Sequence, residues 1–330
     1  MKTLGVLLLV VLGGVAYYHF FYAPRRKRPQ GEKAYVMPES LPVVDTTAVI
    51  RNVIATLHAG QAVLVTERVG DWAQVALGDG RTGWVGQKYL LDAATHGEGE
   101  VLLRQVAEMQ PQATGHTNDS VNLHLAPSRS ARKIMEFAAN QPVEVYDRRV
   151  VSRPHSQASS QVINDVWYLV RGGGDAGWML GRFVDLDIPP GLSNYAQGIN
   201  MVAWLVLDTV NDGGRQVPQY VAADRIGAED VDFNHIRVFT WWVKHHKYVT
   251  AYVESNLEGY FPITVTHVGG VPYFRLRLVD DKGDKFQKVY GLFDTIVRTI
   301  GTVGGWTSTV MPQPRPRGGG LRRQAAVMSH

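Results

Sequence analysis

Short segments with the alternating apolar and polar pattern of half-buried β-strands recur along the chain. Val63 and Val65 fit this pattern, and so does the stretch from Trp72 to Val75. Glycine-rich connections such as Gly78-Asp79-Gly80 separate strand-like segments and are typical of tight hairpins. The pattern therefore predicts a mainly β protein.

One ordered series of these segments occurs twice. The first copy runs from Leu57 to Leu90 and the second from Phe137 to Val184. The spacing between the copies stays constant up to Val65 and Val145, after which the second copy carries an insertion from about Arg149 to Asn164. We expect this polar insertion to form a long exposed loop. A repeated series of this kind indicates two copies of one folding unit.

The repeated series resembles the bacterial Src-homology-3 (SH3) domain. In each copy a Val-x-Val segment is followed by a tryptophan segment, a Gly-Trp segment and a closing aromatic residue. The second copy also contains the stretch Val121-Asn122-Leu123-His124-Leu125-Ala126-Pro127-Ser128, which is close to the first strand of that family. The resemblance implies two small five-stranded SH3-like barrels at residues 34–92 and 114–187. It also implies peptidoglycan, its peptide stem or a protein as ligand.

Large aromatic side chains are the candidate binding residues. A domain of this size needs them in its core, so the tryptophans of the two barrels are interpreted either as core residues or as walls of a ligand groove. In the later stretch Phe239-Thr240-Trp241-Trp242, alternation places the two tryptophans on opposite faces of one strand. One of them should be buried and the other covered or exposed for binding. The candidates are Trp72, Trp84, Trp167, Trp178 and Trp242.

Three further regions lie outside the two predicted barrels and have sequence patterns of their own. Residues 93–113 are predicted to be a linker with a short helix, because apolar residues recur there at helical spacing. Residues 191–303 show consecutive hairpins and predict an antiparallel β-meander or sandwich. Residues 307–330 are rich in Pro, Gly, Arg and Ser and predict a disordered tail.

The N-terminal residues 1–23 form an apolar stretch, followed by a basic spacer at residues 24–33. The apolar stretch is long enough for one membrane-spanning helix, but a signal peptide cleaved after Gly14-Val15-Ala16 is an alternative. The basic cluster from Arg25 to Arg28 favours a cytoplasmic body by the positive-inside rule. The family resemblance favours a body outside the inner membrane, which is the orientation we expect.

Composition excludes several kinds of chemistry. The 330-residue chain contains no cysteine, so it has neither a disulfide framework nor a cysteine nucleophile. The net charge is only +4 and no nucleic-acid-binding motif is present. His245 and His246 point to opposite sides of a strand and are therefore poor metal ligands as a pair. We expect no cofactor, and we regard His124 and His235 as the histidines most capable of an unrecognised activity.

These observations lead to three functional hypotheses. The first is a non-enzymatic envelope protein, anchored in the inner membrane by its N-terminal helix, whose tandem barrels bind peptidoglycan, a peptide or a protein partner. The second is a scaffolding subunit of an envelope complex that binds no small ligand. The third, for which the sequence offers least support, is a cell-wall enzyme with an unrecognised site.

Overall fold

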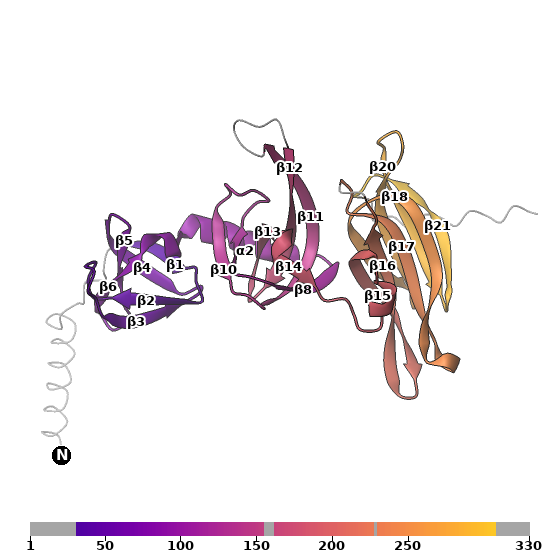
Figure 1. Cartoon of the computed structure of the whole chain (residues 1–330), viewed down its shortest axis with the longest axis horizontal. Helices are drawn as coiled ribbons and strands as arrows, with labels where there is room; N and C mark the ends of the chain where they lie inside the picture. The colour runs from indigo at the N-terminus through magenta and orange to yellow at the C-terminus, as the bar shows by residue number, and fades with distance from the viewer. Residues whose placement is uncertain (1–30, 155–161, 228–229, 308–330) are drawn as a thin grey trace, which may run out of the picture. The chain divides into compact units, whose positions relative to one another are not determined.

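The computed structural model describes residues 31–154, 162–227 and 230–307 (Figure 1). It contains three antiparallel sheets of seven strands each, and α2 (Ala93–Ala107) is the one α-helix of the described residues. The predicted fold class, mainly β with two small barrels and an antiparallel β-domain, is confirmed. The chain divides into two compact units, Met1–Ala93 and Ala94–His330.

The first unit contains a small barrel with strand order β3-β2-β6-β5-β4-β1-β7. Its apolar core is formed by inward-facing side chains such as Val43, Ala73, Val75 and Val85, all fully enclosed. A 3₁₀ helix, η1 (Gln87–Tyr89), connects the last two strands. The strands are β1 (Glu32–Val36), β2 (Ser40–Val44), β3 (Val53–His58), β4 (Ala62–Val69), β5 (Trp72–Ala76), β6 (Thr82–Gly86) and β7 (Leu90–Asp92).

The second sheet repeats the first strand for strand, with order β10-β9-β13-β12-β11-β8-β14. The register is also repeated, since Val44 pairs with Trp84 in the first sheet and His124 with Trp178 in the second. Its strands are β8 (Ala113–Thr117), β9 (Val121–His124), β10 (Lys133–Phe137), β11 (Pro142–Pro154), β12 (Val162–Gly172), β13 (Asp175–Leu180) and β14 (Val184–Leu186). Both sheets exceed the expected five strands, because the segments that begin and close each copy also pair with each other.

The insertion of the second copy is not simply a loop, so that part of the prediction is wrong. Strands β11 and β12 continue into it as a long hairpin, with pairing from Glu144 and Arg171 as far as Pro154 and Val162 (Figure 1). β-branched residues at Val150, Val151 and Val162 favour this extension. Residues 155–161 lie outside the described residues.

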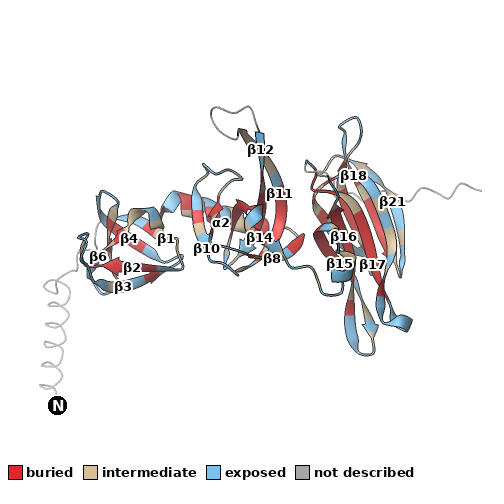
Figure 2. Ribbon diagram, viewed as in Figure 1, coloured by how far each residue is buried: buried red, intermediate tan, exposed pale blue. Residues whose placement is uncertain are grey.

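The third sheet is a meander in which each strand pairs with the next, from β15 to β21. Its apolar core includes Phe233, Ile236, Phe274 and Tyr290. Figure 2 shows buried segments along β16 and β17. The strands are β15 (Asn200–Asp212), β16 (Arg215–Arg225), β17 (Phe233–Trp242), β18 (Lys247–Val268), β19 (Val271–Val279), β20 (Lys285–Phe293) and β21 (Ile296–Gly304).

Strand β18 corrects a second expectation. The sequence predicts separate strands at residues 248–254 and 260–268, but a single strand of 22 residues covers both. Its first part pairs with β17 as far as Gly259, and its later part pairs with β19. Asn256 has a φ of 59° within this strand, a conformation that asparagine tolerates better than most residues.

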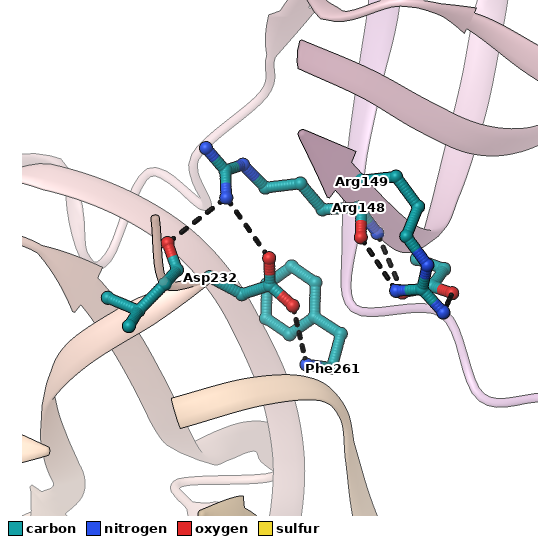
Figure 3. A network of polar contacts seen from close by, with 6 residues as sticks. Arg148, Arg149, Asp232 and Phe261 are labelled. Carbon is teal, nitrogen blue, oxygen red and sulfur yellow. Dashed lines mark hydrogen bonds and ion pairs between the residues drawn. The ribbon is translucent and has the colours of Figure 1, made fainter. Parts of the chain in front are cut away.

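Within the second unit, the second barrel and the third sheet share one apolar core, which contains Leu123 and Met179 of the barrel together with Trp204 and Phe239 of the sheet. A buried ion pair adds to this packing (Figure 3). The Arg148 guanidinium lies 3.1 Å from the Asp232 carboxylate, whose other oxygen accepts a hydrogen bond from the Phe261 amide. The barrel and the sheet are therefore parts of one packed body.

Within the part of the chain that the structure describes, no helix combines the length and apolar character that crossing a bilayer requires. The predicted anchor or signal segment at residues 1–23, most of the basic spacer and residues 308–330 of the predicted tail lie outside the described residues.

Candidate functional site

The first barrel carries a groove of about 900 Å³. Side chains from β2, from the turn between β4 and β5, and from η1 line it. Trp72 and Tyr89 form its aromatic walls, and both are half-buried. Gly86, at the end of β6, is the residue paired with Trp72. A Cβ atom at Gly86 would lie 3.0 Å from the Tyr89 ring, so the glycine keeps the space beside that ring open.

The rim of this groove carries more positive than negative charge. Arg51, Arg68 and Lys88 line it, together with a single carboxylate, Asp71. The Arg51 guanidinium lies 4.9 Å from the centre of the Trp72 ring, and Lys88 Nζ lies 4.9 Å from that of Tyr89. Cations beside aromatic faces suit a ligand that combines apolar groups with carboxylates.

The second barrel has a much smaller hollow at the equivalent position, of about 250 Å³. Leu180 stands there in place of Gly86 and pairs with Trp167 as Gly86 pairs with Trp72. His124 stands in place of Val44, with its ring 5.4 Å from that of Trp167 in an edge-on arrangement. Burial lowers the pKa of His124, which favours the neutral ring. These larger side chains fill most of the space that the first barrel leaves open.

Comparison with known families agrees with this geometry. The model of the bacterial SH3 domain matches residues 51–90. The first barrel contains a bacterial SH3 domain. The matched segment includes Trp72 and Tyr89, whereas the β2 residues that line the groove precede it. We call this groove the SH3 groove.

Solved structures give only a distant likeness. The chain is 10% identical to NlpC2 from Trichomonas vaginalis, covering 69% of this chain and 97% of that one, with a TM-score of 0.19. It is 11% identical to an NlpC/P60 family protein from Bacillus cereus ATCC 10987, covering 62% of this chain and 90% of that one, with a TM-score of 0.22. We draw no argument from likeness at this level. None of the curated proteins matches the chain.

The five predicted tryptophans do not gather into one site. Of these, Trp72 alone lines the SH3 groove. Trp84 is half-buried in β6, while Trp167 and Trp178 are buried in the second barrel. Trp242 is 45% exposed on the third sheet, where its ring lies 3.9 Å from that of His245.

The alternation predicted for the adjacent tryptophans is found in the structure. Trp241 is buried and its indole Nε1 donates a hydrogen bond to Asp212 at 2.8 Å, whereas Trp242 is exposed. Sequence reasoning missed Arg51, Gly86 and Tyr89 as groove residues. The closing aromatic position of the repeat was a usable signal for Tyr89, because it recurs as Phe183 beside the second hollow.

The two histidines singled out from the sequence have structural partners. His235 Nδ1 lies 2.9 Å from the Asp224 carboxylate, which also binds the Arg237 guanidinium at 2.8 Å through both oxygens. His124 Nδ1 lies 3.0 Å from the Ala131 carbonyl oxygen. Among the residues placed by the structure, no group of three or more His, Asp or Glu side chains could hold a metal ion.

Proposed function

We propose that this chain is a non-enzymatic envelope protein that binds peptidoglycan through the SH3 groove of its first barrel. The observation that carries the proposal is the open groove between Trp72 and Tyr89 with its positive rim, located within a bacterial SH3 domain. A peptide stem with free carboxylates matches this combination of aromatic walls and cations. Residues 1–23 would anchor the chain in the inner membrane with its body outside the cytoplasm.

The second barrel has a different role in this proposal. Its hollow is small and Trp167 is only 1% exposed, so it offers a ligand little aromatic surface. Its packing on the third sheet through a common core suits a structural role. We therefore assign binding to the first barrel and propose that the second joins it to the C-terminal sheet.

An alternative is supported by one further observation. Trp242 and Val243 are large apolar residues exposed beside the turn between β17 and β18, at 45% and 41%. An exposed pair of this kind is a possible contact for a protein partner, as the scaffolding hypothesis requires. The two functions predict different effects of mutation.

Sedimentation with purified peptidoglycan sacculi distinguishes peptidoglycan binding by the SH3 groove from a scaffolding role of the third sheet. The full chain should sediment with sacculi, and Trp72→Ala should weaken binding by about tenfold or more, because a central aromatic contact contributes roughly 2 kcal/mol or more. Trp242→Ala is the matched control and should bind like the wild type. Equal binding by Trp72→Ala and the wild type would refute the groove as the site, and loss with Trp242→Ala alone would favour the third sheet.

A further inference from the structure

The third sheet divides at one end into two separate hairpins. Strands β16 and β17 pair only as far as Tyr220 and Phe239, so the β15–β16 and β17–β18 hairpins continue beyond that point as two arms (Figure 1). The Asp212 carboxylate of the first arm links them, because it accepts a hydrogen bond from Trp241 Nε1 at 2.8 Å and lies 2.7 Å from His246 Nδ1. The ends of the two arms therefore form one projecting surface.

The end of the second arm exposes apolar side chains. Trp242 is 45% exposed and Val243 is 41% exposed, and Figure 2 shows the ends of both arms as exposed. Alternation along β17 produces this arrangement, because Trp241 packs into the core and Trp242 must face the other way. The His245 ring lies 3.9 Å from that of Trp242 and still leaves nearly half of this residue in solvent. An aromatic and an aliphatic side chain together at a projecting turn mark a contact surface.

Basic side chains surround the exposed tryptophan. Lys244 and Lys247 lie in and beside the same turn, and the Lys247 Nζ is 5.7 Å from the centre of the tryptophan ring. Arg215 belongs to the first arm, where it pairs with Asp212, and all three cations are exposed. The Asp212 side chain is only 9% exposed, and Asp208 lies farther back along β15, outside the turn. The exposed charge at the end of the arms is therefore positive.

A membrane surface matches this combination of groups. Tryptophan favours the boundary between lipid headgroups and acyl chains, because its ring is apolar and its N–H is polar. Lysine and arginine place their charged ends among anionic headgroups while their stems pack on apolar surface. Protein interfaces are depleted in lysine, whereas two of the three cations here are lysines, so the composition favours lipid over a protein partner. We call this surface the hairpin tip, and its residues are Arg215, Trp242, Val243, Lys244 and Lys247.

We propose that the hairpin tip docks onto a membrane surface that carries anionic headgroups. Trp242 and Val243 enter the interfacial layer, and the three basic side chains contact headgroup phosphates. The proposal goes beyond peptidoglycan binding and does not depend on it, because the tip belongs to the third sheet and the SH3 groove to the first barrel.

The absence of cysteine from the chain allows a single reporter to be placed at the tip. The full chain with Val243→Cys, labelled with the environment-sensitive fluorophore NBD, is reconstituted with vesicles. One set contains phosphatidylcholine alone, and the other contains phosphatidylglycerol as about a quarter of the lipid. NBD emission should shift to the blue with the anionic vesicles and remain at its value in water with the neutral ones. High salt should reverse the shift, because it screens the attraction between the basic side chains and the headgroups.

A second reporter, at Asp281→Cys, is the control for attachment of the chain by other segments. Asp281 is exposed in the turn after β19. Near this turn Leu278 pairs with Gly259, which also pairs with Phe233 at the start of β17. Trp242 ends β17, so the two reporters mark opposite ends of that strand. The control reporter should remain in water with both lipids, and an equal blue shift at the two positions would overturn docking through the tip.

Charge variants locate the contact. In the Val243→Cys chain, Lys244→Gln together with Lys247→Gln should lower the ratio of membrane-bound to free reporter by about thirtyfold, the effect of two basic side chains at about 1 kcal/mol each. Lys282→Gln, in the exposed control turn, should leave this ratio unchanged. An equal response to neutral and anionic vesicles, or an unchanged ratio in the double variant, would overturn the proposal. A tip reporter that remains in water with both kinds of vesicle would also overturn it and would favour a protein partner for this surface.

Discussion

At the scale of single residues, Trp72 and Trp167 show how one repeated position acquires two roles. Trp72 begins β5 and Trp167 lies within the longer equivalent strand β12, and each pairs with the end of the next strand, at Gly86 and Leu180 respectively. The glycine leaves the first ring beside an open groove, whereas Leu180 and His124 enclose the second. The role of each tryptophan is therefore decided by its neighbours.

This difference predicts that the same substitution lowers stability by different amounts at the two positions. Trp167→Ala should lower the free energy of unfolding of the second unit by about 3–5 kcal/mol, because it removes a fully buried side chain. Trp72→Ala should lower the free energy of unfolding of the first unit by a smaller amount, because the Trp72 ring is already partly exposed. Urea denaturation of the full chain and both variants measures these costs, and a larger loss for Trp72→Ala would contradict the assignment.

Asp147 makes the stability of the second unit depend on pH. Burial raises the pKa of its carboxyl to about 6, despite the ion pair with Arg149. Between about pH 4 and pH 6 the folded carboxyl keeps a proton that the unfolded chain has released, so stability falls as pH rises through this window.

Replacing this carboxyl should remove that slope. In Asp147→Asn, the change in unfolding free energy between about pH 4 and pH 6 should be smaller than in the wild type by roughly 2–3 kcal/mol. Asp165→Asn is the control, because Arg129 and Arg153 lower the pKa of Asp165 to about 2 and its stabilisation is lost only as pH falls below about 4. An unchanged slope in Asp147→Asn, measured by chemical denaturation across this range, would show that the carboxyl is not the cause.

At the scale of elements, the sequence predicts strands and hairpins better than their ends. The repeat and the order of hairpins in the third sheet follow from local alternation and turn residues. The extension of β11 and β12 and the continuity of β18 depend on cross-strand pairing between residues such as Ser152 and Asn164, which local patterns do not show. The groove was only partly predictable for the same reason. Arg51 and Tyr89 are distant from Trp72 in the sequence, and the folding of the barrel brings all three to one groove.

The connection between α2 and β8 contains a structural element that no pattern predicts. The Gln112 side-chain amide donates to the Ile263 carbonyl oxygen at 3.0 Å and accepts from the Ile263 N–H at 2.7 Å. Gln110 makes the same pair of bonds with Val265. These amides satisfy backbone groups of β18 beyond the segment that pairs with β17.

Gln112→Leu should therefore destabilise the second unit by about 2–4 kcal/mol, because it leaves two buried backbone groups without their partner. The Ile263 amide should also exchange its hydrogen faster. Gln110→Leu, at a more exposed position, is the control and should cost less. Denaturation with hydrogen-exchange measurements checks both effects, and unchanged exchange at Ile263 would contradict the bonding role.

At the scale of the whole molecule, the second barrel and the third sheet should unfold together. They share an apolar core, and the ion pair between Arg148 and Asp232 is almost completely buried. Asp232→Ala should lower the free energy of unfolding by about 3–5 kcal/mol, because it removes the carboxylate beside a buried guanidinium. Asp281→Ala, on an exposed turn, should change stability by less than about 0.5 kcal/mol. Calorimetry showing separate transitions for the barrel and the sheet would contradict their coupling.

The most direct measurement of function is an NMR titration of the full chain with soluble peptidoglycan fragments, following the indole N–H signals of Trp72, Trp167 and Trp242. We predict that the Trp72 signal shifts with increasing fragment concentration and saturates, while the Trp167 and Trp242 signals stay in place. Shifts at Trp167 or Trp242 with none at Trp72 would contradict the assignment of peptidoglycan binding to the SH3 groove.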